Sequence, residues 1–269
     1  MKRSILLLVL VVATTGVAVG DSITFNASGV NPESGDLAAS ATFEISGSQL
    51  IITLTNTGPT AYKQSDLLAG VFFDLADVNE LERVSATLVG DYAVVYGDGV
   101  TPFEAPEGYE NLLPDVGTEW AAVVNQTDDD PLLLDGTSFR GAQYGISVNG
   151  YGPFGPDNRF ETTLPAYVLD HPSSPDGSNF GMASSIGPEG INGILDTPIV
   201  VGGSVQFVFN VTGALSTADI SNVNFQYGTD ADKNPNIQNG VVPEPSTMSL
   251  LGLGIAGFMA MAKMRRKHA

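Results

Sequence analysis

The chain has 269 residues, of which 30 are acidic and 11 are basic, with two histidines and no cysteine. The lack of cysteine excludes disulfides and thiolate metal sites. The histidines are too few for a histidine-based zinc site, which needs several such ligands.

The first residues have the three parts of a secretory signal peptide. Lys2-Arg3 supply the positive start, Ile5 to Val12 form an unbroken apolar run, and Ala18-Val19-Gly20 match a small-x-small cleavage site. The alternative is a membrane anchor, but this apolar run is shorter than the roughly 17–25 residues of a spanning helix. The sequence therefore predicts a cleaved signal peptide over residues 1–20.

The segment between the two chain ends is strongly acidic. Without residues 1–20 and 243–269, the chain keeps five basic residues against 29 acidic ones, a net charge of −24. Such a charge favours solubility, attracts divalent cations and repels nucleic acid and anionic lipid. Because of this charge, we expect no nucleic-acid partner. A body of this length can also bury a large core without disulfides.

Residues 21–230 are predicted to form one all-β body, a single β-sandwich or jelly-roll-like domain, because short alternating segments are separated by turn residues. Ser22 to Ala27 is the first expected strand. Leu37 to Ser46 and Leu50 to Thr55 then alternate apolar and polar residues around Gly47-Ser48, which predicts a hairpin with one buried face.

Further along, Leu67 to Leu75 is almost wholly apolar and predicts a central buried strand. The other expected strands are 84–89, 93–96, 119–124, 144–148, 204–211 and 222–227, with a surface loop over 97–117. The expected core includes Phe43, Leu54, Phe72, Phe207, Phe209, Val223 and Phe225. Residues 231–242 are predicted to be a polar linker.

Catalytic patterns are weak in this body. His171 is its one histidine, and no Gly-x-Ser-x-Gly elbow surrounds Ser184 or Ser185, so a Ser-His-Asp triad is not indicated. Glu119 beside Trp120 is the one pairing that fits a glycosidase, because Trp can stack on sugar; the alternative is a strand residue beside a core aromatic. We expect no enzymatic activity.

One cluster of aromatic residues is a candidate for ligand binding. Four aromatic residues close in sequence could form a carbohydrate-binding surface, but glycine and proline interrupt them, which favours a packed loop. These residues are Tyr144, Tyr151, Phe154 and Phe160.

Two acidic segments are calcium candidates. Asp230 and Asp232 begin a pattern like an EF-hand loop, but Pro235 replaces its glycine and Val241 its bidentate glutamate. The second segment comprises Asp128, Asp129, Asp130 and Asp135, which also fit a solvated turn. We therefore expect no cofactor beyond weakly bound calcium.

Residues 243–269 are predicted to comprise a turn motif, a transmembrane helix and a basic stop. Pro243-Glu244-Pro245 prevents a helix from running through it, and Ser246 to Ala262 then provides seventeen residues without charge. This length lies at the short end of what spans a bilayer. The positive-inside rule places the basic residues that follow in the cytoplasm and the body outside. They are Lys263, Arg265, Arg266 and Lys267.

This arrangement resembles the PEP-CTERM sorting signal of bacterial exported proteins. The matching parts are Pro243-Glu244-Pro245, the glycine-rich apolar segment and the Arg265-Arg266-Lys267 terminus. The resemblance implies recognition by an exosortase, a membrane protease that removes the tail near the motif, in a Gram-negative host that makes extracellular polysaccharide. The alternative is a permanent C-terminal anchor.

The body also resembles one group of exosortase-dependent surface proteins without an assigned activity. The likeness covers most of residues 37–230 and is carried by residues 67–75, 117–120, 145–147, 174–177 and 220–228. It implies a single family domain and adds no catalytic residue.

These observations lead to one expected function. The chain is predicted to be an exported, non-enzymatic surface or matrix protein, sorted by an exosortase after a transient inner-membrane stage. Its expected partners are extracellular polysaccharide, in a biofilm for example, or neighbouring surface proteins. The alternatives are a carbohydrate-binding module with exposed aromatics in a row, or a secreted glycoside hydrolase.

Overall fold

The computed structural model describes residues 21–76, 80–104, 113–123, 142–149, 154, 158–161, 179–191 and 193–229, and the backbone of three further short strands. Within this part of the chain, every regular element is a β-strand or a single 3-10 turn, so the predicted all-β class is confirmed. None of the described segments is a helix with the length and apolarity needed to cross a membrane. The predicted signal peptide and sorting tail lie outside the described residues.

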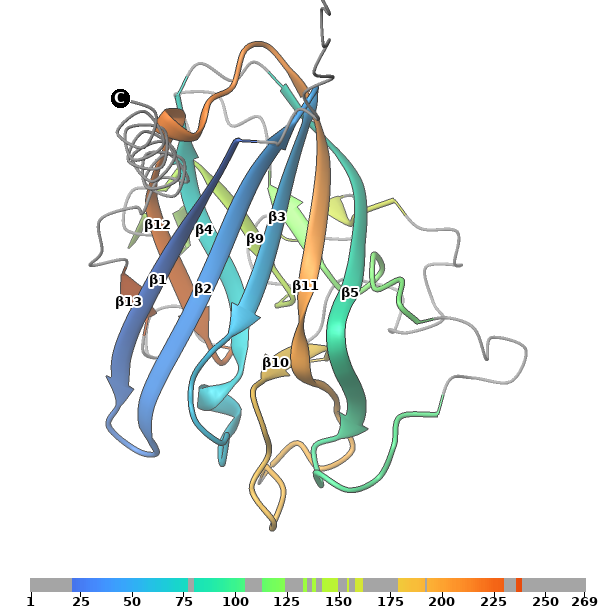
Figure 1. The fold of residues 1–269 in the computed structure, drawn as a ribbon. Coiled ribbons are helices and arrows are strands. Elements are labelled where there is room, and N and C mark those ends of the chain that lie inside the picture. Colours follow the sequence, from blue (N-terminus) through green and yellow to red (C-terminus); the bar gives the residue numbers. More distant parts are fainter. Residues whose placement is uncertain are drawn as a thin grey trace, which may run out of the picture.

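Five long antiparallel strands form what we call the front layer (Figure 1). Their order is β1-β2-β3-β11-β5. They span Asp21–Asn31 (β1), Gly35–Ser46 (β2), Gln49–Asn56 (β3), Pro198–Thr212 (β11) and Glu80–Tyr96 (β5). The β2–β3 pair is the hairpin that the alternation around Gly47-Ser48 predicts.

The remaining strands of this sheet form the back layer, in the order β6-β9-β4-β12-β13. They span Ala121–Val123 (β6), Tyr144–Ser147 (β9), Leu68–Leu75 (β4), Ile220–Tyr227 (β12) and Asn236–Gln238 (β13). The strand β10 (Gly181–Ala183) joins the layers, because it pairs with β11 and also with β4. A separate hairpin consists of β7 (Leu133–Leu134) and β8 (Thr137–Ser138).

The long strand β11 bends at a glycine pair. Residues 199–201 pair with β10, whereas residues 205–210 pair with β3. Between them, Gly202 and Gly203 have φ of 66° and 54°, a region that glycine adopts without steric cost. A Cβ atom on Gly203 would lie 2.6 Å from the Cβ atom of Tyr92. The register shift between β11 and β5 at this point thus requires glycine, and it separates the part of β11 that pairs with β10 from the part that pairs with β3.

The two layers face each other across an apolar core. The Phe43 and Phe73 rings, from β2 and β4, have centroids 5.2 Å apart, and Trp120 lies 5.1 Å from Phe207. All seven residues expected in the core are buried, and Phe72 belongs to a separate cluster with Phe154 rather than to this interface. Inward side chains alternate with outward ones along β2 and β3, as a sheet with one buried face requires.

Some predicted strand boundaries are wrong. Residues 84–89 and 93–96 belong to one strand, β5, because both segments pair with the long strand β11 and the chain passes Gly90 at a φ of 83° without reversing. The strand expected at Glu119 begins at Ala121. Part of the expected 97–117 loop returns to β5, where Asp115 bridges Thr87 and Val116 is buried. The strand β13 lies within the segment expected to be a linker.

Candidate binding face and sorting motif

The glycosidase candidates Glu119 and Trp120 lie in the core. Both side chains are fully buried. The Thr118 hydroxyl donates a hydrogen bond to Glu119 Oε1 over 3.2 Å, and the Trp120 ring packs edge-on against Phe207. In this conformation neither side chain can contact a polysaccharide. The structure therefore supports the alternative interpretation, in which Glu119 lies beside a core aromatic residue.

The described members of the aromatic cluster do not form an exposed surface. Tyr144, Phe154 and Phe160 are each buried, and Tyr144 stacks on Phe73 with centroids 5.9 Å apart. Burial raises the pKa of the Tyr144 phenol, and the nearby Asp74 carboxylate raises it further. The fourth aromatic, Tyr151, lies outside the described residues. These three rings therefore support the packed-loop alternative.

Serines 184 and 185 have structural contacts. Ser184 Oγ donates to the Pro59 carbonyl over 2.8 Å, and Ser185 Oγ donates to Thr60 Oγ1 over 2.9 Å. His171 lies outside the described residues, as do all six calcium candidates. Among the residues that the structure does describe, no group of three or more histidine, aspartate or glutamate side chains could hold a metal ion.

Part of the outer face of the front layer instead carries polar side chains in register. Two rows cross all five strands, and we call them together the hydroxyl face. The first row is Thr24, Thr42, Thr53, Gln206 and Thr87. The second row is Asn26, Ser40, Thr55, Ser204 and Val89. Figure 1 shows these five strands side by side at the front of the molecule.

The hydroxyl face carries no charged side chain within its two rows, although the body as a whole has a large negative charge. None of the ten side chains is buried. Two contacts tie neighbouring strands: Thr24 Oγ1 lies 2.8 Å from Thr42 Oγ1, and Thr55 Oγ1 lies 2.6 Å from Ser204 Oγ. Hydroxyl and amide groups both donate and accept hydrogen bonds, so this face can pair with a hydroxyl-rich ligand.

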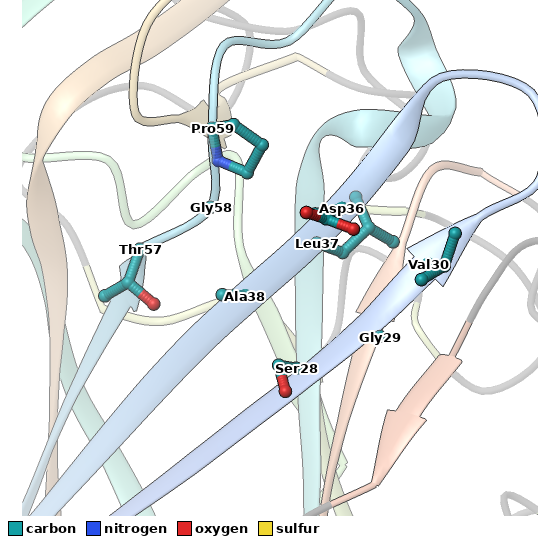
Figure 2. Close-up of a pocket in the computed structure, with 9 residues that line it drawn as sticks. All are labelled: Ser28, Gly29, Val30, Asp36, Leu37, Ala38, Thr57, Gly58 and Pro59. Carbon is teal, nitrogen blue, oxygen red and sulfur yellow. The ribbon is translucent and has the colours of Figure 1, made fainter.

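A groove of about 390 Å³ lies at one end of the hydroxyl face (Figure 2). It opens where β3 leaves β2, because their pairing ends at Asn56 and Ala39 while β1 and β2 stay paired to their turn. Figure 2 shows it bordered by polar and apolar side chains from all three segments. The polar ones are Ser28, Asp36 and Thr57, and the apolar ones include Val30, Ala38 and Pro59.

Polar contacts of the buried Asp66 hold together the segments that flank this groove. The Asp66 carboxylate accepts hydrogen bonds from Asn31 Nδ2 at 2.7 Å, from the amides of Tyr62 and Lys63 at 3.0 Å each, and from the hydroxyl of Ser34. These contacts join the β1–β2 turn to the segment after the groove, which leads into the 3-10 turn η1 (Gln64–Asp66).

The opposite wall is fixed by the side chain of Asn56. Its Oδ1 accepts from the amide of Gly58 over 3.0 Å, and its Nδ2 donates to the Met182 carbonyl over 2.9 Å. The groove is therefore preformed.

The sequence contained part of the signal for this face. The alternation along residues 37–46, 50–55 and 204–211 places serine, threonine and glutamine on the side away from the core. What sequence reasoning missed is that five strands align these residues in rows, because β11 and β5 pair with distant partners. The groove also escaped prediction, since it depends on where β3 separates from β2.

Comparison with known proteins concerns the other functional segment. The family model of the PEP-CTERM protein-sorting motif matches residues 241–267, which contain the predicted Pro243-Glu244-Pro245 and basic stop. No curated protein and no solved structure matched the chain. The chain therefore carries a PEP-CTERM protein-sorting motif, which marks it as an exported protein that an exosortase sorts to the cell surface.

Proposed function

We propose that this protein is a non-catalytic component of the cell surface or extracellular matrix that associates with extracellular polysaccharide. The observation that carries the proposal is the sorting motif at residues 241–267. The uncharged hydroxyl face supports it, because neutral polar groups suit a hydroxyl-rich partner. The glycoside hydrolase alternative gains no support from Glu119, whose side chain is buried.

The proposal includes a route to the surface. A signal peptide over residues 1–20 starts export in a Gram-negative host, and the segment Ser246 to Ala262 holds the chain in the inner membrane until the exosortase acts. The two facing layers then form a β-sandwich body outside the cell. A permanent C-terminal anchor is the competing fate.

The mass of the extracellular product tests this route. In a host with an exosortase, the product is expected to begin near Asp21 and to end within Pro243 to Ser246. Replacing Pro243-Glu244-Pro245 by three alanines is expected to leave the protein in the inner membrane. Full-length protein, residues 1–269, in the outer fraction would instead support the permanent anchor.

Association with polysaccharide is tested separately. The processed product is expected to co-purify with the extracellular polysaccharide of its host and to leave that fraction after the polysaccharide is digested. A product that remains free in the medium, with polysaccharide intact, would contradict the proposed function while leaving the sorting route in place.

A further inference from the structure

We propose that the hydroxyl face and its terminal groove form the polysaccharide-contact site, and that this site takes an uncharged chain. This inference rests on the proposed function and adds to it the site and the charge class of the ligand. It is carried by the register of the two rows, the lack of charge within them and the groove that ends them.

The rows provide a regular grid of hydrogen-bonding groups. Neighbouring strands lie about 4.8 Å apart and residues on one face of a strand about 6.8 Å apart, so a row across five strands extends about 19 Å. Nine of the ten side chains in the rows are threonine, serine, asparagine or glutamine, and Val89 is the exception. A surface of this extent can contact several sugar units of one chain at once.

The charges around the grid select the ligand. Along the strands, Glu44 and Glu82 lie on one side of the rows, and Asp36 lies in the groove on the other side. At the β5 end of the first row, Asp115 forms a bridge with Thr87. An anionic polysaccharide would meet these carboxylates and the net charge of the body, and like charges at an interface are unfavourable. Over the rows, an uncharged chain meets hydroxyls, amides and the apolar Val89, so no charged group must lose its water there.

The groove provides a stronger contact than the open face. Asp36 is exposed and its carboxylate can accept a hydrogen bond from a sugar hydroxyl, a charge-assisted bond that is stronger than a neutral one. Val30 and Pro59 offer apolar surface to the C–H side of a sugar ring. Because Asp66 and Asn56 already fix the groove, binding does not require the walls to be ordered first.

The groove also lies away from the end of the sheet toward which β13 runs. In β13, Asn236 faces Gln226 and Gln238 faces Asn224, so the chain runs toward the start of β12. There the 3-10 turn η3 (Thr217–Asp219) is bonded to Asp21, since Thr217 Oγ1 donates to Asp21 Oδ2 over 2.8 Å. The groove lies at the opposite end of β1, which leaves it accessible on the side away from this end of the sheet.

The test measures retention of the full-length protein, in mild detergent, by cellulose, dextran and alginate. The wild-type protein is expected to bind an uncharged polymer, cellulose or dextran, and not the anionic alginate. The variant Thr24→Val/Thr42→Val/Thr53→Val removes three hydroxyls but keeps side-chain shape and strand preference. Loss of three hydrogen-bonding groups is expected to weaken retention about tenfold or more.

Two further variants complete the design. Thr217→Val is the matched control, since it makes the same exchange away from the hydroxyl face and should bind like wild type. Asp36→Asn tests the groove alone and is expected to weaken binding by a smaller factor. It also keeps the test informative if the triple variant fails to fold.

Each outcome decides between the site and the function. Unchanged retention of the triple variant and of Asp36→Asn would overturn the site and leave the proposed function standing. Equal retention by alginate would overturn the charge class. If none of the three polymers retains the protein but the protein still co-purifies with its native polysaccharide, this inference alone is overturned. If the protein shows neither retention nor co-purification, the proposed function is overturned as well. Dimers that the triple variant abolishes would assign the face to a second copy.

Discussion

The phenol of Tyr227 donates a hydrogen bond of 2.7 Å to the carbonyl oxygen of Ala38 and so connects the two layers. Tyr227 belongs to β12 in the back layer, whereas Ala38 belongs to β2 and lines the groove. The same carbonyl also accepts from the amide of Thr57 over 2.8 Å. One backbone group of the groove is thereby held from two sides.

Tyr227→Phe is expected to lower the free energy of unfolding by about 1 kcal/mol, the usual net value of one hydrogen bond. The cost stays small because the Ala38 carbonyl keeps its bond from Thr57. Urea unfolding of the full-length protein measures this. Tyr62→Phe, at a ring that is 54% exposed, is the matched control and should change stability by less than about 0.5 kcal/mol. Equal effects of both variants would contradict the role of the bond.

Alkaline pH should destabilise the protein through its buried tyrosines. Burial raises the pKa of Tyr227 well above its usual value and also raises that of Tyr144. The folded state therefore keeps these protons when the unfolded chain loses them, above about pH 10. The free energy of unfolding should stay level below that pH and then fall, by up to about 1.4 kcal/mol per pH unit for each tyrosine.

Urea unfolding as a function of pH checks this expectation, and Tyr227→Phe should reduce the alkaline slope. A stability that is unchanged from about pH 8 to about pH 11 would contradict the assignment, since protons would then be bound equally in both states.

Asp66→Asn should loosen the groove. The carboxylate accepts on both oxygens, from the backbone amides of Tyr62 and Lys63 on one and from Asn31 Nδ2 on the other. An amide has a single acceptor oxygen, so at least one of these donors would face Nδ2 and lose its acceptor. We expect a loss of about 2–4 kcal/mol, because bonds to a charged group are stronger than neutral ones. Asp91→Asn, at an exposed aspartate, is the control and should be close to neutral. Thermal unfolding of both variants decides the matter.

Phe207→Ala should be the most damaging of these substitutions. The ring is fully buried and lies 5.1 Å from Trp120 and 5.3 Å from Phe160 between the layers. A large-to-small change in a core costs about 3–5 kcal/mol. Val100→Ala, at a side chain that is 75% exposed, should cost little. A midpoint shift for Phe207→Ala no larger than that of Val100→Ala would contradict the core assignment.

Calcium should stabilise the protein modestly, and we propose the two acidic segments, Asp128 to Asp135 and Asp230 to Asp232, as its ligands. Neither has a complete ligand set, so the affinity should resemble the roughly 10⁻⁴–10⁻³ M of extracellular calcium modules. Millimolar calcium should therefore raise the melting temperature by binding the folded state. Sodium chloride at matched ionic strength is the control for screening. Equal shifts in both salts would remove the proposal.

Local patterns in the sequence were sufficient for some features of this protein. The Pro243-Glu244-Pro245 motif and the segments around it predicted the sorting signal, because a linear signal is read from consecutive residues. Alternation along residues 37–46 and 50–55 predicted the hairpin and buried faces, since side chains of a strand point to opposite sides in turn.

Only the tertiary structure decided which strands lie together. The Thr55–Ser204 contact joins residues 149 positions apart, and no local pattern specifies such a partner. The same long-range pairing buried Glu119, merged two expected strands into β5 and aligned the rows of the hydroxyl face. The groove likewise arises where β3 separates from β2. The sequence alone determined the sorting motif and the strand periodicity. The hydroxyl face required the tertiary structure, because its residues meet only through pairing between distant strands.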